Sequence, residues 1–409
     1  MGEGRAPEEI RHALFSFMML NLLAGCATGI LQLAIPLYAM ELRASTAQLG
    51  LIAGFNGVGR LLVIIPCGLL IDRWGARRLF LGSTLLAAGA VLALFRVRFP
   101  GTLMLATGVL GTLQSVVFLS LQAGFLKRLP YLRPAQAGWQ RGATQFGFFL
   151  MGPLLGGYLL RNGEFGQSFL VVSAMFAVCL LICLYRRWIG VHEVADNVVQ
   201  GGAGRLARFK ALLDNRLFLQ ILGFECLGNA AFMVFRSFIG PVGVDVLHLS
   251  VQTVSWLIVS QGIAAMSVLL CSNRLLERMS MSGLFGLSGT LMVAGSLLLA
   301  LADSFALFWL GTALFGLGTG TVSFASLSRI GRIGGEKGMI AGLFSFSVAL
   351  GNTVGPSAAG CVGTIFSPRA AFLTLVPVIA SCALAVAVTR QQRGRFEKEA
   401  PVFESETNM

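Results

Sequence analysis

The chain has 409 residues, of which 56% are hydrophobic and 12% are charged, and its formal net charge is +13. Soluble domains carry about 25% charged residues, about twice the fraction in this chain. The low charged fraction and the mean hydropathy of +0.78 together exclude an ordinary water-soluble protein. The basic excess would suit a nucleic-acid partner, but its distribution along the chain indicates membrane topology instead, and we expect no nucleic acid to bind.

Apolar stretches long enough to cross a bilayer recur along the whole chain. A transmembrane helix needs about 20 apolar residues, and the period-two alternation of barrel strands is absent. We predict twelve spans, at residues 13–40, 46–71, 79–97, 101–126, 138–160, 166–188, 216–247, 251–275, 280–302, 304–329, 339–363 and 367–389. The predicted fold class is therefore an all-α membrane protein.

The basic residues are distributed unevenly between the loops. With a cytoplasmic N-terminus, only five of the 31 Lys and Arg fall in outer loops and three lie inside spans. This asymmetry follows the positive-inside rule and predicts that both termini are cytoplasmic. All eight cysteines lie within predicted spans without paired spacing, so we predict neither a metal site nor a cofactor.

A turn rich in glycine and charge follows the second span. Gly68 and Gly75 allow close packing and a tight reversal, and Asp72 suits the positive N-terminal end of a neighbouring helix. Arg73 and Arg77 can pair with acids or with lipid headgroups. We predict a cytoplasmic gate here; the alternative is a solvated topology anchor.

The fifth span carries the segment Gly152-Pro153-Leu-Leu-Gly156-Gly157. Glycine lets helices approach closely and proline interrupts the helical hydrogen bonds, so we predict a bend. A degenerate copy in the eleventh span, Gly355-Pro356, predicts a second bend.

The sequence repeats itself at a distance of 205 residues. At this offset Asn56 meets Gln261, and the Asp72-Arg73 turn meets Glu277-Arg278. Four further coincidences are Pro36 with Pro241, Ser45 with Ser250, Gly111 with Gly316 and, after a two-residue slip, Gly152-Pro153 with Gly355-Pro356. We predict two pseudo-symmetric six-helix bundles, residues 1–188 and 216–409, joined by a cytoplasmic linker at 189–215.

This duplicated bundle with a Gly-x-x-x-Asp-Arg-x-Gly turn resembles the major facilitator superfamily. The resemblance covers almost the whole chain, although Ala76 replaces the first of the family's paired basic residues. It implies that two halves rock around a central cavity where substrate binds near the midplane. The Gly-Pro segment of the fifth span is close to a motif of the family's proton-driven exporters.

Four ionisable residues are predicted inside the membrane, where such groups usually have a function. Arg60 lies about 18 Å from the cytoplasmic turn, and Glu225 lies about 14 Å inside the seventh span. Because burial favours the neutral carboxyl group, we predict that Glu225 carries the coupling proton; the alternative is a static ion pair with Arg60. Arg60, Arg236 and Arg141 are predicted to bind substrate, whereas the alternatives are an interhelical hydrogen bond for Arg60 and snorkelling to the headgroups for the other two.

Uncharged polar residues are expected to complete the substrate site, although most of them could also serve helix packing. They are Asn21, Asn56, Gln114, Asn229 and Gln261. Three arginines against one glutamate bias the cavity toward an anion.

We therefore predict a monomeric secondary transporter of the bacterial cytoplasmic (inner) membrane that exports a small organic anion or polar metabolite in exchange for protons. A carboxylate-type siderophore is one example of such a substrate. The sequence leaves open uptake of a similar solute, or a sensor or scaffold that transports nothing. An enzyme is not predicted, because no cluster of His, Cys or acidic residues resembles a catalytic arrangement.

Overall fold

The structure is a computed structural model that describes residues 5–126, 139–185, 210, 212, 214–271, 279–330 and 337–381. Every regular element in these ranges is a helix. The first bundle contains α1 (Arg5–Glu41), α2 (Thr46–Trp74), α3 (Ala76–Ala93), η1 (Leu94–Arg96), α4 (Pro100–Leu126), α5 (Trp139–Phe146), η4 (Gly147–Met151), α6 (Gly152–Leu159) and α7 (Phe165–Tyr185). The second contains α9 (Arg216–Pro241), η5 (Val242–Val246), α10 (Val251–Cys271), α12 (Met281–Leu301), α13 (Phe305–Ile330), α14 (Lys337–Ile365) and η6 (Pro368–Leu373).

These helices confirm the predicted fold class of an all-α membrane protein. In the part of the chain that the structure describes, ten helices are long and apolar enough to cross a membrane. The predicted fifth span is divided into α5, the π-helix η4 and α6, and the described part of the twelfth is a short apolar helix, Pro368–Ser381. The predicted linker at 189–215 lies almost entirely outside the described residues.

Matching caps start corresponding helices of the two bundles. The Ser45 hydroxyl accepts from the Gln48 N–H at 3.3 Å, while the Gln48 side chain accepts from the Ser45 N–H, which forms a capping box at the start of α2. At the start of α10, the Ser250 hydroxyl accepts from the Thr253 N–H at 3.1 Å. Ser45 and Ser250 are 205 residues apart, as the repeat predicts.

The pseudo-symmetry extends to close contacts inside each bundle. A Cβ atom on Gly111 of α4 would collide with the carbonyl oxygen of Asn56 on α2. A Cβ atom on Gly316 of α13 would collide in the same way with the carbonyl oxygen of Gln261 on α10. Only glycine permits so close an approach. The two glycines therefore let corresponding helix pairs, α2 with α4 and α10 with α13, pack closely in the two halves.

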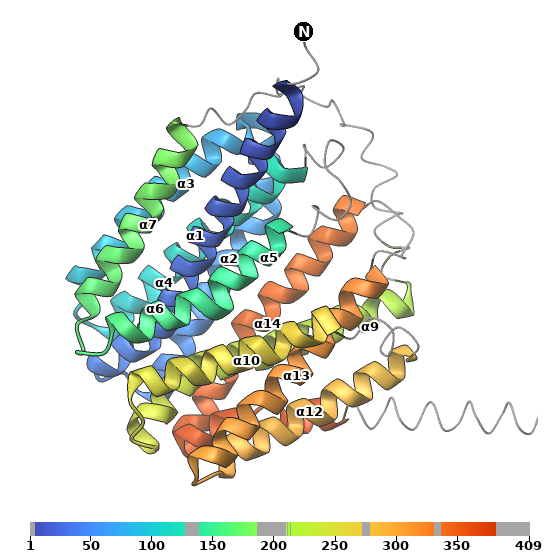
Figure 1. Ribbon diagram of the computed structural model, residues 1–409. Coiled ribbons are helices and arrows are strands. Elements are labelled where there is room, and N and C mark those ends of the chain that lie inside the picture. Colours follow the sequence, from blue (N-terminus) through green and yellow to red (C-terminus); the bar gives the residue numbers. More distant parts are fainter. Residues whose placement is uncertain are drawn as a thin grey trace, which may run out of the picture.

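Among the described helices, the two bundles meet mainly where α2 packs on α14, α6 on α10 and α1 on α9 (Figure 1). We call the end of the molecule that holds the α2–α3 turn the turn end, and the other the far end. Helix α1 begins at the turn end (Figure 1). The interface between the bundles is the setting of the candidate site.

Candidate functional site

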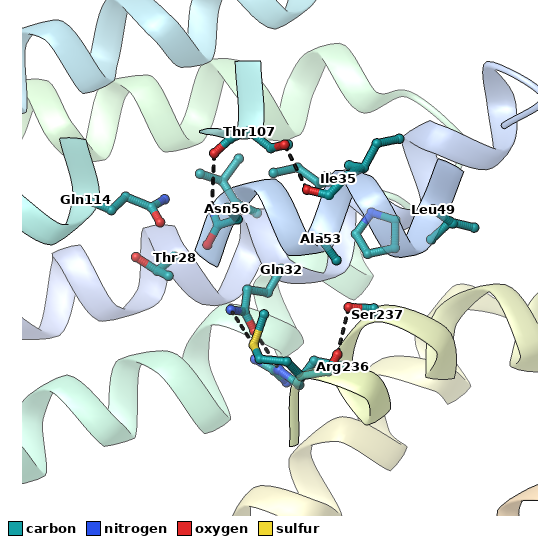
Figure 2. A pocket seen from close by; sticks show the side chains of 14 residues that line it. Thr28, Gln32, Ile35, Leu49, Ala53, Asn56, Thr107, Gln114, Arg236 and Ser237 are labelled. Atoms are coloured by element: carbon teal, nitrogen blue, oxygen red, sulfur yellow. Dashed lines mark hydrogen bonds between the residues drawn. The ribbon is translucent and has the colours of Figure 1, made fainter. Parts of the chain in front are cut away.

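A cavity lies between α1, α2, α4 and α9, at the interface of the two bundles (Figure 2). Apolar side chains form much of its wall, among them Leu31, Ile35, Leu49, Ile52 and Met233. Its polar groups are Thr28, Gln32, Asn56, Thr107, Gln114, Arg236 and Ser237. A mostly apolar wall with few polar groups is typical of a small-molecule site.

Arg236 supplies the charge of this cavity. Its side chain is only 3% exposed, and its Nε–H donates to Gln32 Oε1 at 3.0 Å. Nη2 donates to the Phe148 carbonyl in a long hydrogen bond of 3.5 Å, and the guanidinium lies 4.8 Å from the centroid of the Phe148 ring. The guanidinium thus lies buried between the bundles.

No acid balances this buried cation. In the ranges that the structure describes, no carboxylate lies within ion-pair distance of Arg236, and its Nη1 is buried without a hydrogen-bond partner. An isolated charge at this depth is unfavourable unless something pairs with it. The arrangement can therefore bind a negatively charged group.

Two of the predicted polar residues line the same cavity. Asn56 donates to the Thr107 carbonyl at 3.4 Å and Gln114 extends from α4 (Figure 2). Thr107 in turn donates to the Ile52 carbonyl at 2.9 Å, which fixes α4 against α2. The structure thus brings Asn56, Gln114 and Arg236 together around one space.

Glu225 lies in a separate cluster on α9, nearer the turn end. It is 6% exposed, and Asn229 donates to its Oε1 at 3.1 Å. Its Oε2 is buried beside the Ser326 hydroxyl. Arg141 of α5 is the cation whose charge acts on this carboxyl group.

The alternative of a static ion pair between Arg60 and Glu225 is wrong for this structure. No ion pair joins these two residues, although both are described. Arg60 is half-buried, and its Nε is buried without a partner in the described part of the chain. The similar depth predicted for the two groups therefore did not imply contact.

The remaining predicted polar residues take part in helix packing and do not line this cavity. Asn21 accepts from Thr144 at 3.0 Å and from Gln140 at 3.4 Å, which joins α1 to α5. Gln261 is fully buried and donates to Thr319 at 3.3 Å, which joins α10 to α13. Its Oε1 is buried and unpaired within the described ranges.

The glycine-rich turn forms the end of α2 as predicted. Gly75 closes the helix with φ 83°, a backbone conformation that glycine adopts without strain, and its N–H donates to the Ile71 carbonyl at 2.9 Å. Arg73 is exposed, and Arg77 donates to the Cys183 carbonyl at the end of α7, at 3.4 Å. The side chain of Asp72 and the residues Glu277 and Arg278 lie outside the described residues.

The bundles are in close contact at the far end. On α2, a Cβ atom on Gly50 would collide with the Pro356 carbonyl, and one on Gly54 with the Ser357 hydroxyl, both on α14. On the symmetry-related interface, a Cβ atom on Gly157 would collide with Ser255. Backbone and side chains thus seal the cavity toward the far end.

Three glycines nearer the turn end have no such contact among the described residues. Positions Gly68 of α2, Gly142 of α5 and Gly342 of α14 each have open space where a Cβ atom would stand. Among the described residues, the close glycine contacts between α2 and α14 therefore lie toward the far end.

The predicted bend of the fifth span coincides with a change in helical hydrogen bonding. The π-helix η4 ends at Gly152, directly before Pro153, and Gly152 and Gly156 both lie against α1. Around Pro356, by contrast, α14 is one continuous α-helix, with Gly355 against α9. The interruption is therefore seen in only one of the two copies.

Sequence reasoning missed Gln32, which holds Arg236, and the smaller polar residues Thr28, Thr107 and Ser237. Thr28 and Gln32 are four residues apart in an otherwise apolar span, so they share one helix face. That spacing was the available signal for a polar stripe on the first span.

Comparisons with known proteins agree with this geometry. The family model of the Major Facilitator Superfamily matches residues 17–328 and 226–406. No curated protein matches the chain. Among solved structures, the nucleoside transporter NupG superposes with a TM-score of 0.77 at 15% identity, covering 92% of this chain and 98% of that one.

Two further solved structures have the same fold. A bacterial homolog of the human lysosomal transporter Spinster, inward-facing and unoccupied, gives a TM-score of 0.71 at 14% identity over 92% of each chain. The human organic anion transporter MFSD10 gives 0.66 at 18% identity, over 92% of this chain and 99% of that chain. At these identities the likeness concerns the fold alone.

Proposed function

The chain belongs to the major facilitator superfamily, and on that premise we propose that it is a secondary active transporter of a small organic anion. The observation that carries the proposal is Arg236, a buried cation without an acidic partner in the described ranges, on the wall of the cavity between the bundles. Alternating access around this cavity would expose Arg236 to one side of the membrane and then to the other.

The nature of the anion is constrained by the number of arginines that reach the cavity. Arg236 belongs to its lining, whereas Arg60 and Arg141 do not. This composition favours an anion with one negative group over the carboxylate-rich siderophore expected from three arginines. A solved relative of the same fold is described as an organic anion transporter, which is compatible with this class.

Proton coupling is the second part of the proposal, and Glu225 is its candidate. The carboxyl group is buried on α9 between Asn229 and Ser326 and is influenced by Arg141 of the other bundle. A change in the separation of the bundles would change the distance between these two charges, and with it the tendency of Glu225 to hold a proton. This couples the proton to the conformational cycle.

We propose export in exchange for protons, in a bacterial cytoplasmic membrane with both termini in the cytoplasm. The support is the uneven distribution of basic residues and the Gly152-Pro153 segment with its two following glycines. In this orientation the turn end is cytoplasmic, and the Asp72 turn would close it when the far end opens. The gate would act at a distance from the cavity that selects the substrate.

The test compares organic anions inside and outside cells that contain or lack the protein. Export predicts internal accumulation of one anion in the deletion strain, and proteoliposomes with wild-type protein should transport that anion against its gradient. The Arg236→Gln variant should lose this transport. External surplus in place of internal accumulation would indicate uptake, and unchanged anion pools would contradict transport of an anion altogether.

A further inference from the structure

The carbonyl group that binds Arg236 is free because of a local irregularity in the fifth span. At the end of η4, the Gly152 N–H donates to the Gly147 carbonyl instead of the Phe148 carbonyl. The next residue, Pro153, has no N–H to donate. The Phe148 carbonyl therefore accepts neither an α-helical hydrogen bond, from the N–H four residues later, nor a π-helical one, from the N–H five residues later.

This free carbonyl holds Arg236 across the interface. It accepts from Nη2 at 3.5 Å, while Gln32 on α1 accepts from Nε at 3.0 Å. The Phe148 ring lies 4.8 Å from the guanidinium carbon and the Phe232 ring lies 5.8 Å from it. Two acceptors of the first bundle thus fix a guanidinium of the second.

The hydrogen bonds that Arg236 already makes determine which of its N–H groups can still donate to a ligand. A guanidinium has five N–H bonds, and Gln32 and Phe148 use one on Nε and one on Nη2. The remaining N–H bonds are on Nη1, which has no hydrogen-bond partner in the described ranges, and on Nη2. They match the two oxygens of one carboxylate in the bidentate geometry that arginine prefers.

We propose that Pro153 is a positioning residue, because its missing N–H leaves the Phe148 carbonyl free to accept from Arg236. This proposal rests on the proposed transport of an organic anion. The site that results binds a ligand with one carboxylate attached to an apolar body. The apolar body contacts the wall formed by Leu31, Ile35 and Ile52. Thr28 and Gln114 remain for a polar substituent.

Replacing Pro153 restores a donor to the Phe148 carbonyl in either helical register. If η4 stays a π-helix, the new N–H at position 153 points to the Phe148 carbonyl. If the segment becomes α-helical, the Gly152 N–H takes that carbonyl. In both cases an intrahelical donor competes with Arg236.

The experiment is a double-mutant cycle on the purified full-length protein, with calorimetric binding of benzoate as the monocarboxylate probe. Benzamide and phthalate serve as the neutral and the doubly charged probes. The variants are Pro153→Ala, Arg236→Gln and the two combined. Pro356→Ala is the matched control, because it restores an N–H inside the continuous helix α14. Should Pro153→Ala fail to fold, Pro153→Gly restores the same N–H without a Cβ atom.

We expect wild type to bind benzoate more tightly than benzamide or phthalate, and Pro153→Ala to weaken benzoate binding about fivefold, as for one lost hydrogen bond. In the Arg236→Gln background Pro153→Ala should have no further effect, because Pro153 acts through that arginine. Unchanged affinity in Pro153→Ala, or effects that add in the double variant, would overturn the role of Pro153 and leave anion transport standing. Equal binding of benzoate and benzamide by wild type would overturn both proposals.

Discussion

Arg236 of α9 donates its Nε–H to Gln32 of α1 at 3.0 Å, a hydrogen bond that joins the two bundles on the wall of the central cavity. The two side chains are 204 residues apart in the sequence. The bond orients a buried cation and at the same time makes its position depend on the contact between the bundles. Substrate binding and conformational change therefore share one group.

Replacing Gln32 by Leu should weaken anion binding about tenfold. The substitution removes the acceptor of the Arg236 Nε–H, and a buried donor without a partner costs about 1–3 kcal/mol. Equilibrium binding of the transported anion to purified protein measures the effect. The control is Gln167→Leu, which replaces an exposed glutamine at the start of α7, outside the cavity lining, and should bind normally. Equal affinities in both variants would contradict the role of Gln32.

Replacing Glu225 by Gln should abolish proton-driven accumulation while leaving anion exchange intact. The amide preserves the shape and the contact with Asn229 but cannot carry a proton. Proteoliposomes give both readouts, since counterflow of labelled anion needs no proton gradient. Asp245→Asn is the control, because Asp245 is an exposed carboxylate beyond the end of α9. Concentrative transport by Glu225→Gln at the wild-type rate would remove Glu225 from the coupling mechanism.

Replacing Gly54 by Val should shift the protein away from the state described here. The added side chain would collide with Ser357 on α14, so α2 and α14 must separate at the far end. The halves should then approach each other at the turn end while they separate at the far end. Distances between spin labels at the turn ends of α2 and α14 should therefore shorten. Gly68→Val, which meets open space on the same helix, should leave these distances unchanged. Identical distance distributions in the two variants would argue against rocking about this contact.

Replacing Gly75 by Ala should destabilise the protein by about 1–2 kcal/mol, because residue 75 has φ 83° and a Cβ atom is strained there. Gly82→Ala in the middle of α3, where a Cβ atom meets nothing within 4 Å, should stabilise the helix by about 0.5–1 kcal/mol. Thermal unfolding in detergent compares the two variants. The opposite order of melting temperatures would show that the turn does not require glycine.

The fold could be predicted from the sequence because the bilayer imposes strong constraints. Uniformly apolar stretches, bounded by charged turns, mark helices that must satisfy their own backbone hydrogen bonds. The repeat at 205 residues also has a structural cause: Asn56 and Gln261 each lie under a glycine of another helix. These two contacts with backbone carbonyls require glycine at both Gly111 and Gly316.

The site was predictable only in part. Depth along a helix follows from residue counting. Counting predicted that Arg236 and Asn56 lie in the membrane interior. The direction in which a side chain points depends on how neighbouring helices are rotated, and counting carries no such information. For this reason Arg60 and Glu225 share a depth without forming an ion pair. No helical N–H donates to the Phe148 carbonyl because η4 is π-helical, and sequence periodicity does not reveal this register.

The central claim is that the charge of Arg236 selects the substrate. The most direct measurement is the ratio of affinities for the transported anion and its uncharged amide, in wild type and in Arg236→Gln. We predict that wild type binds the anion at least about tenfold more tightly than the amide, the discrimination expected from a charged hydrogen bond, and that the ratio falls to about one in the variant. An undiminished ratio in Arg236→Gln would contradict the account.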